Sequence, residues 1–396
     1  MFAHLRQQLN GIIGQAVLGL YKDTPPSAIL IDFPADKQHG EFSCNIAMQL
    51  SRVLKKNPMT IAQEILPRLR RGLSASAIAP YIEKAEVKAP GFINFYVSLK
   101  GFCAVIEDVF AKQERFGTSG HGQGQKFCLE FVSANPTGPL TVAHGRQAAV
   151  GDSLVNILKA VGFDAKKEYY VNDEGNQINI LGRSIEARVR QALGADAAFP
   201  EDGYQGDYIR AMAQEFMRKQ GIKTITDLDK QPAEAFRHFG VDHLMAVIQK
   251  DLEDFDVHFD IWSYQSKIAT TRAIEEVLAD LKAKEFICES EGALWFKSTL
   301  WGDDKDRVVR KSNGEYTYLM PDIVYHNDKF SRGFKRIVDI LGPDHHGYIS
   351  RIKAAAGALG KSPDDLDVMI VQLATIYRDG KPVSMSTRRG EFISLR

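Results

Sequence analysis

The sequence contains little cysteine, and its four cysteines lie far apart. Cys44, Cys103, Cys128 and Cys288 share no close spacing along 396 residues. They therefore predict neither a zinc site nor a disulfide framework. Scattered cysteines are typical of proteins kept in a reducing compartment, so we expect a cytoplasmic protein.

An excess of charge of one sign and long apolar runs are also absent. The chain has 50 Lys and Arg residues against 50 Asp and Glu residues. Its net charge thus gives no overall attraction to nucleic acid, and any RNA binding must come from local basic patches. No apolar run approaches the roughly 18 residues that a membrane-spanning helix needs, and the polar residues Arg6, Gln7 and Gln8 near the start favour an amphipathic helix over a signal peptide. We expect no association with membranes.

The most informative stretch is 127–152. Its apolar run over 127–132 predicts a buried strand, an Asn-Pro and Gly-Pro turn over 135–139 ends that run, and a long helical pattern follows. The first N–H groups of such a helix, and its dipole, point at whatever occupies the turn. The arrangement therefore predicts a phosphate-binding site, with His144 at the start of the helix.

Strand and helix patterns alternate through the rest of this region. Helical spacing dominates 176–281, and we expect further strands over 166–171, 294–297, 307–310, 316–319, 337–341 and 368–376. Alternation of this kind favours an α/β fold. We predict a doubly wound parallel, Rossmann-like nucleotide-binding domain with a largely helical insertion at about 176–300.

The first part of the chain has a different pattern. Strands over 29–33 and 92–97, with helices over 46–54, 61–69 and 102–116, predict a small α+β domain. The glycine-rich segment after it predicts a linker. We therefore expect domains at 1–116 and 126–396, joined by a linker over 117–125. The sequence ends in GEFISLR, which has the composition of neither a tail nor a domain end, and we interpret this as a cut through a longer protein.

Four segments in order resemble the class I aminoacyl-tRNA synthetases, and within them the arginyl-tRNA synthetases. Segment 133–140 (SANPTGPL) is similar to the lead-in to the first signature, His-x-Gly-His, and 169–177 (YYVNDEGNQ) to a stretch one helix later. Segments 341–348 (LGPDHHGY) and 383–392 (VSMSTRRGEF) resemble two more landmarks, the last being the Lys-Met-Ser-Lys-Ser-type loop. The resemblance covers almost the whole chain.

This resemblance implies an arginine–tRNA ligase. It implies ATP-dependent activation of L-arginine to arginyl-adenylate and transfer to tRNA(Arg), with ATP and Mg²⁺ bound as Mg-ATP. It also implies a monomer, an N-terminal domain that contacts the tRNA elbow, and a helical C-terminal anticodon-binding domain that this sequence lacks. Family members generally need tRNA to activate arginine, so we expect this chain alone to be weak in activation.

The resemblance also implies roles for individual residues, with no metal ligand among them. The residues implied to be catalytic are Thr141, His144, Ser384, Met385, Ser386, Thr387 and Arg388. Those implied to bind ATP are Gly138, Pro139, Leu140, Val142, Ala143, His144, Gly145, Asp344, His345, Gly347, Val371, Gln372 and Lys381. Those implied to bind arginine are Glu130, Ser133, Ala134, Asn135, Gln265, Tyr318, Asp322 and Asp344. The last group suits a guanidinium, which has five donors and no acceptor.

Several of these residues have ordinary structural interpretations as well. His144 at a helix start could be a helix cap, and Asp344 and His345 could form a turn. Tyr318 and Asp322, four residues apart, could lie on a solvated helix face. Basic clusters at 55–56 and 68–71 could be solvated helix ends or could touch RNA phosphates.

The signatures depart from the family at five positions. Thr141 and Ala143 replace the first histidine and the glycine of the first signature, Ser384 and Thr387 replace the two lysines of the second, and Gly138 stands where some relatives have a compensating lysine. Losing one preorganised donor typically costs ~10²–10³ in rate, so Lys381, Arg388 and Arg389 would have to compensate. The alternatives are a non-catalytic synthetase-like module that binds arginine or RNA and a nucleotidylyltransferase, which would leave Tyr318 and Asp322 unexplained.

Overall fold

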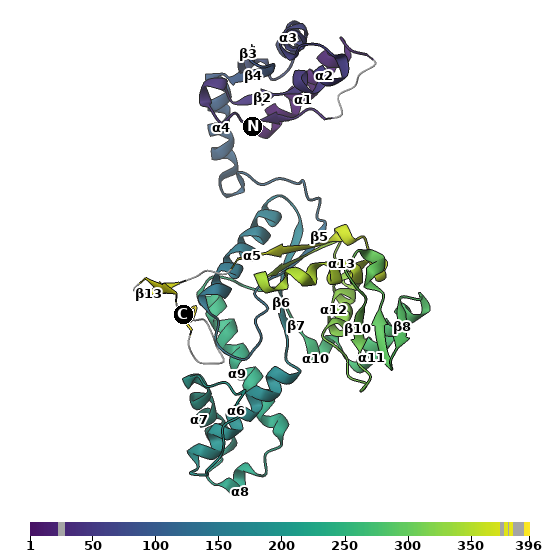
Figure 1. The fold of residues 1–396 in the computed structure, drawn as a ribbon. Helices are drawn as coiled ribbons and strands as arrows, with labels where there is room; N and C mark the ends of the chain where they lie inside the picture. Colours follow the sequence, from purple (N-terminus) through teal and green to yellow (C-terminus); the bar gives the residue numbers. More distant parts are fainter. Residues whose placement is uncertain (23–27, 373–375, 379, 383–391) are drawn as a thin grey trace. The chain divides into compact units, whose positions relative to one another are not determined.

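The computed structural model describes residues 1–22, 28–372, 376–378, 380–382 and 392–396. The chain divides into two compact units, Met1–Gly117 and Thr118–Arg396 (Figure 1). Within the described ranges, no helix has both the length and the apolar character needed to cross a membrane.

The first unit is a four-stranded antiparallel sheet with helices. The strands have the order β1-β2-β4-β3. Leu5, Leu9 and Ile13 recur every four residues on α1 and are buried with the sheet residues Phe42 and Phe95, as an amphipathic helix requires. The elements are α1 Phe2–Leu18, β1 Ile31–Asp32, β2 Phe42–Cys44, α2 Ile46–Leu54, α3 Pro58–Ser74, β3 Ile82–Lys88, β4 Phe92–Val97 and α4 Leu99–Lys112, with short 3₁₀ turns at Lys37–His39, Ala79–Tyr81 and Gln113–Arg115.

The second unit is built on a five-stranded parallel sheet with the order β12-β11-β5-β6-β7. The chain runs outward from β5 to one edge and then returns to fill the other side, so the order reverses between β5 and β11. In open α/β sheets ligands bind outside the carboxyl ends of the strands at such a reversal. The strands are β5 Lys126–Glu130, β6 Asp164–Val171, β7 Ile261–Tyr264, β11 Arg336–Leu341 and β12 Leu366–Ile370. The predicted fold class is confirmed.

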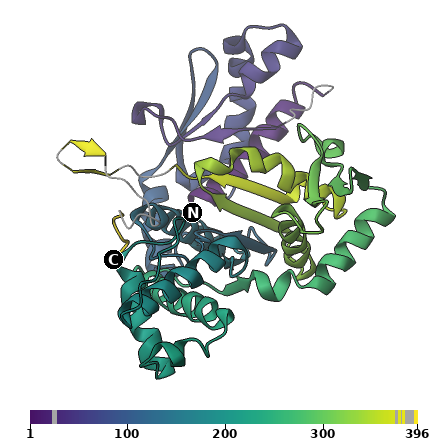
Figure 2. The ribbon, with the colours of Figure 1, turned by 60° about the horizontal axis from the view of Figure 1, so that its bottom comes forward.

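Helices connect these strands. α5 (Val142–Ala160) links β5 to β6, and four helices between β6 and β7 form a separate cluster with its own core, the teal group in Figure 2. Those four are α6 Asn176–Ala192, α7 Asp207–Gln220, α8 Ile225–Leu228 and α9 Ala233–Asp254. Between β7 and β11 lie α10 Gln265–Ile268, α11 Thr271–Ala283, the antiparallel strands β8 Ile287–Ser290, β9 Ala293–Phe296 and β10 Arg307–Arg310, the 3₁₀ turn Ser298–Trp301, and α12 Leu319–Ser331.

The chain then continues from β11 through a 3₁₀ turn into α13. These elements are Pro343–Tyr348 and α13 Ile349–Ala358, followed by the 3₁₀ turn Pro363–Asp365 before β12, and by the paired short strands β13 Tyr377–Arg378 and β14 Lys381–Pro382.

Three sequence expectations need correction. The helical stretch expected from residue 176 onward is interrupted by β7, which joins the parallel sheet; this strand is only four residues long and carries no long apolar run. The strand expected over 316–319 is wrong, because Tyr316 makes a single bridge and α12 begins at Leu319. Pro321 in the first turn of α12 was the available signal, since proline is tolerated there. β12 ends at Ile370 rather than at residue 376.

The glycine-rich segment expected as a linker is bonded to the second unit over much of its length. The N–H groups of Ser119, Gly122 and Gly124 donate to carbonyls at the end of α5 and just beyond it, at 2.8 to 2.9 Å. A Cβ at Gly122 would overlap Phe163, so this close approach requires glycine.

Candidate active site

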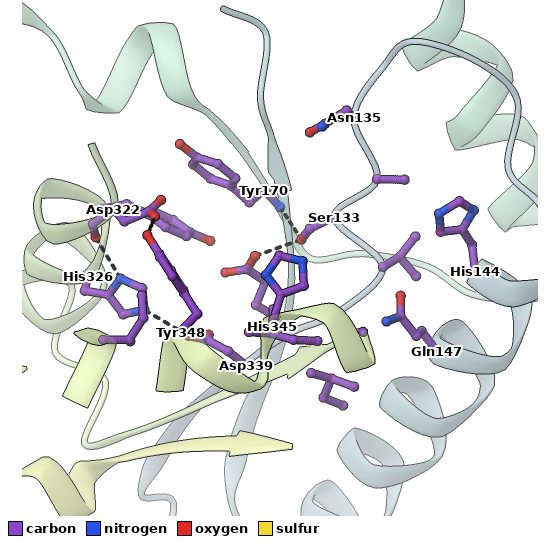
Figure 3. A pocket seen from close by; sticks show the side chains of 18 of the residues that line it. Ser133, Asn135, His144, Gln147, Tyr170, Asp322, His326, Asp339, His345 and Tyr348 are labelled. Carbon is purple, nitrogen blue, oxygen red and sulfur yellow. Dashed lines mark hydrogen bonds and ion pairs between the residues drawn. The ribbon is translucent and has the colours of Figure 1, made fainter. Parts of the chain in front are cut away.

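A cavity of about 370 Å³ opens at the carboxyl ends of β5 and β11, where the strand order reverses. Asp322, His326 and Tyr348 lie on one side, His144 and Gln147 on the other, and Ser133 between them (Figure 3). The cavity brings together eight of the residues expected at the site: Glu130, Ser133, Ala134, Asn135, Ala143, His144, Asp322 and His345.

The turn after β5 has a strained backbone. Val132 and Ser133 have φ values of +68° and +39°, a region that a β-branched residue such as valine rarely adopts. Ser133 Oγ donates to Glu130 Oε1 at 2.9 Å and accepts from the Tyr170 N–H at 3.0 Å. Tyr169 Oη donates to the Ala134 carbonyl at 2.8 Å. These bonds hold the strained turn, and strain of this kind clusters at functional sites.

The start of α5 forms the opposite wall. The backbone N–H of Thr141, the residue before the helix, donates to His144 Nδ1 at 3.0 Å. Because Nδ1 accepts this bond, the neutral ring carries its proton on Nε2. Burial lowers the pKa of His144, which favours the neutral ring. His144 is therefore both a helix cap and a donor available through Nε2.

One face of α12 carries Asp322, His326 and Lys329 at spacings of four and three. His326 Nδ1 lies 2.7 Å from the Asp322 carbonyl and Nε2 lies 2.9 Å from Asp339 Oδ2. Both partners only accept, so both ring nitrogens donate and the ring is an imidazolium. Burial acts to lower the pKa of His326, but Asp339 more than offsets it and the pKa is raised. Lys329 Nζ donates to Glu130 Oε2 at 2.5 Å and to Asp339 Oδ1 at 2.8 Å.

Asp322 accepts a hydrogen bond from Tyr348 Oη. Burial raises the pKa of Asp322 to about 6, with the Tyr348 bond acting in the opposite direction. Among these described groups three carboxylates, Glu130, Asp322 and Asp339, face two cations, His326 and Lys329. Once Asp322 is ionised, these five groups carry one more negative than positive charge, and a bound cation would neutralise the excess.

Comparisons with known proteins identify the family. Residues 105–396 match the family model for class I tRNA synthetases (R), catalytic domain, and residues 3–97 match that for the arginyl tRNA synthetase N-terminal domain. The chain is 44% identical to an arginine–tRNA ligase of Anoxybacillus flavithermus over 99% of its length and 41% identical to that of Bacillus subtilis, also over 99%. The chain belongs to the arginyl-tRNA synthetases. The family predicted from the sequence is confirmed.

The chain spans about 70% of the length of the Anoxybacillus synthetase and 69% of the Bacillus one. The fold agrees with that of Thermus thermophilus arginyl-tRNA synthetase, with a TM-score of 0.67 at 18% identity, over 93% of this chain and 66% of that one.

Other residues expected at the site do not line the cavity. Tyr318 precedes α12 and is 67% exposed, so it is directed to solvent. Gln265 does not line the cavity but contacts a residue that does: its Oε1 accepts a hydrogen bond from Tyr170 Oη at 2.9 Å. Val371, directly after β12, is buried and its N–H donates to the Leu341 carbonyl at 2.9 Å, whereas Gln372 is exposed. Gly138, Pro139, Leu140, Thr141, Val142, Gly145 and Gly347 neighbour the wall in sequence but do not line it.

The remaining expected residues cannot be placed by their side chains. Ser384, Met385, Ser386, Thr387 and Arg388, with Arg389, lie outside the described residues, as do the side chains of Asp344 and Lys381.

Several residues in or next to the cavity were not predicted from the sequence. Tyr170, Gln147, His326, Asp339 and Tyr348 line the cavity, and Lys329 lies behind it. Two signals were available. His326 and Lys329 follow Asp322 at helical spacing, and Asp339 is the one polar residue in the run 337–341, where a buried carboxylate needs a partner.

Proposed function

We propose that this chain performs the reactions of an arginine–tRNA ligase: activation of L-arginine with ATP and transfer of arginine to tRNA. Family membership supports the reaction, and the cavity supports the amino acid. The observation that carries the proposal is Asp322, a carboxylate whose pKa burial raises to about 6, in a cavity where a further cation would balance the charge.

Arginine fits this wall by charge and by its donor groups. We propose that Asp322 accepts from the guanidinium, and that Glu130, Ser133 and Asn135 contact the main-chain groups of the amino acid. Charge-assisted hydrogen bonds contribute roughly 1.5–3 kcal/mol each. A planar fork of five donors can satisfy two oxygens of one carboxylate, which the ammonium of lysine cannot do with the same geometry.

ATP fits the opposite wall. His144 can donate from Nε2, and the start of α5 directs its dipole to the same side of the sheet. The described residues contain no group of three His, Cys, Asp or Glu side chains that could hold a metal ion. Mg²⁺ in nucleotide sites is usually held by substrate phosphates, water and one or two carboxylates; when bound with ATP it would neutralise charge on the phosphates.

The chemistry needs positioning more than proton transfer. A carboxylate oxygen of arginine bonds to the α-phosphorus as the bond from that phosphorus to the pyrophosphate oxygen breaks, which gives arginyl-adenylate and pyrophosphate. A ribose hydroxyl of tRNA then attacks the acyl carbon and AMP leaves. The residues of this wall would hold the two reactants in line, and donors such as His144 would stabilise charge on the phosphate.

We propose tRNA(Arg) as the partner of the first unit, Met1–Gly117, which matches the family's N-terminal domain. Lys55, Arg68 and Arg71 are its candidate phosphate contacts, whereas Arg70 donates to the Ala85 carbonyl and Lys56 pairs with Glu64. We also expect the protein to work as a monomer in the cytoplasm.

Calorimetric titration with arginine, citrulline and lysine tests the amino-acid assignment. Arginine should bind, and citrulline, which keeps the shape and loses the charge, should bind at least about tenfold more weakly, as should lysine. Asp322→Asn should abolish the preference for arginine over citrulline. Asp328→Asn is the matched control, because Asp328 lies on the same helix and pairs with Arg332 away from the cavity. Equal affinity for arginine and citrulline in the unchanged chain would contradict the assignment.

The replaced signature residues favour one competing function, a synthetase-like module that binds arginine or RNA without chemistry. Thr141 stands at the first histidine position, and its backbone N–H is occupied by His144. Aminoacylation assays separate the two functions. If the full-length natural protein charges tRNA with no change to its sequence, the module hypothesis fails. If it binds arginine and charges only after Thr141→His and Ser384→Lys, the module hypothesis holds.

A further inference from the structure

Lys329 is buried between two carboxylates on neighbouring strands. Glu130 on β5 and Asp339 on β11 are direct partners in the parallel pairing, so their side chains lie on the same face of the sheet. Lys329 reaches them from α12 with a side chain of 0% exposure, and Nζ donates to both, at 2.5 and 2.8 Å. Nζ also lies 4.3 Å from the centre of the Tyr325 ring. Two carboxylates this close would otherwise repel each other.

Each carboxylate connects Lys329 to a different part of the cavity. Glu130 accepts from Ser133 Oγ and so supports the turn in which Val132 and Ser133 have positive φ. Asp339 accepts from His326 Nε2, and His326 Nδ1 bonds to the Asp322 carbonyl. The two halves of the amino-acid wall, one from β5 and one from α12, therefore meet at a single ammonium group.

We propose that Lys329 is a positioning residue for arginine: it holds Glu130 and Asp339 side by side, and through them sets the places of the Ser133 turn and of Asp322. This inference rests on the proposed function. Lys329 does not line the cavity, so it acts through its partners and not by touching the substrate.

Several charged or titratable groups surround this ammonium. Those that interact with it are Cys128 and Glu130 from β5, Glu168 from β6, Asp339 from β11, and Tyr325, His326 and Asp328 from α12. Beyond them are Asp322 and Arg332 on the same helix, and His345 and Tyr348 on the cavity wall. Burial acts to lower the pKa of Lys329, but Asp339 and Glu130 more than offset it, so that the pKa lies well above its usual value and the group stays charged. Removing that charge would leave two adjacent buried carboxylates, which favours binding of a shared proton.

Lys329→Met tests the proposal, since methionine keeps an unbranched apolar stem. Arginine affinity should fall by roughly 10- to 100-fold near pH 7. It should then rise with pH above about 7, as the carboxylate pair loses its shared proton, whereas the unchanged chain should show a flat profile there. ATP affinity, measured in the same titrations, should be unaffected.

Arg332→Met is the matched control. Arg332 lies on the same helix and is half-buried; its Nη2 donates to the two carboxylate oxygens of buried Glu168 at 2.8 and 3.0 Å, but Arg332 lines no part of the cavity. It should lose stability in urea as Lys329→Met does, yet keep its arginine affinity and a flat pH profile. Equal losses of arginine affinity in both variants would overturn the proposal, because general destabilisation would then explain them.

A rescue variant keeps the test decisive if Lys329→Met does not fold. Lys329→Met combined with Asp339→Asn removes the repelling pair, so it should fold and bind arginine more tightly than the single variant, with the rise above pH 7 gone. A double variant that folds and binds no arginine overturns the proposal, as does a single variant with the affinity and pH profile of the unchanged chain. Failure of the unchanged chain to bind arginine would instead contradict the proposed function.

Discussion

The affinity for arginine should depend on whether Asp322 is ionised. Burial raises the pKa of Asp322 to about 6 in the chain without ligand. A guanidinium needs the ionised carboxylate, so arginine affinity should be constant above about pH 7 and fall about tenfold per pH unit below about pH 6. Calorimetry between about pH 5 and about pH 8 measures this, with Asp322→Asn as a variant that should bind weakly at every pH. A flat profile in the unchanged chain would show that Asp322 does not pair with the substrate.

The raised pKa of Asp322 should make the stability of the fold decrease with pH, whereas it should make the affinity for arginine increase with pH. A carboxyl group whose pKa is raised on folding stabilises the fold while it is protonated. The contribution of Asp322 to the free energy of unfolding should therefore be largest at low pH and lost as pH rises through about 6. Saturating arginine should reverse this trend, because the bound cation favours the ionised form.

At the residue scale, the sequence predicted some residues that line the cavity better than it predicted the residues behind them. Glu130, Ser133 and Asp322 could be named because segments of the chain resemble a known family. The sequence carried a local signal for Asp339 and for Lys329 but not for their pairing, because a single sequence does not show which strand a helix covers.

Helix α5 packs closely against the residue that precedes the strained turn. Gly151 lies over Phe131, and a Cβ at Gly151 would overlap that ring. Gly151→Ala should therefore force α5 or Phe131 to move, at a cost of about 1–3 kcal/mol. Since Phe131 directly precedes the strained turn, arginine affinity should fall as well. Urea unfolding followed by tryptophan fluorescence measures the cost, because Trp262, Trp295 and Trp301 all lie in the second unit.

Gly11→Ala is the control for this prediction. Gly11 is a helical glycine in α1 with nothing within 4 Å of an added Cβ, so alanine should raise helix stability by up to about 1 kcal/mol. Because Gly11 lies in the first unit, the tryptophan-monitored transition should not change. A loss in that transition equal to that of Gly151→Ala would show that the overlap with Phe131 is not the cause.

Among the elements, long amphipathic helices and apolar strands were predictable, and short ones were not. β7 has four residues and is a strand because it pairs with β6 and packs Trp262 against Tyr169, with ring centres 4.7 Å apart. That stabilisation comes from tertiary contacts, which local periodicity does not report. The strand predicted over 316–319 was wrong because local propensity was given too much weight. The aromatic residues of this segment favour a strand, but the proline at 321 fits the start of a helix.

At the scale of the whole molecule, each unit has its own hydrophobic core. The core of the first unit is drawn from residues before 98, and every residue that lines the cavity lies in the second unit. Units with separate cores can often fold alone. Helix and strand patterns that change on either side of a glycine-rich segment are the basis of the expected domains at 1–116 and 126–396.

Residues 118–396 expressed alone should therefore bind arginine with the affinity of the whole chain, as measured by calorimetry. Their affinity for tRNA(Arg), measured by filter binding at fixed salt, should be lower by about tenfold or more, because a linked second contact is lost. Asp322→Asn in the shortened chain is the control: it should lose arginine and keep the remaining tRNA affinity. Unchanged tRNA affinity in the shortened chain would refute a tRNA contact by the first unit. Loss of arginine binding in a folded shortened chain would show instead that the cavity depends on that unit.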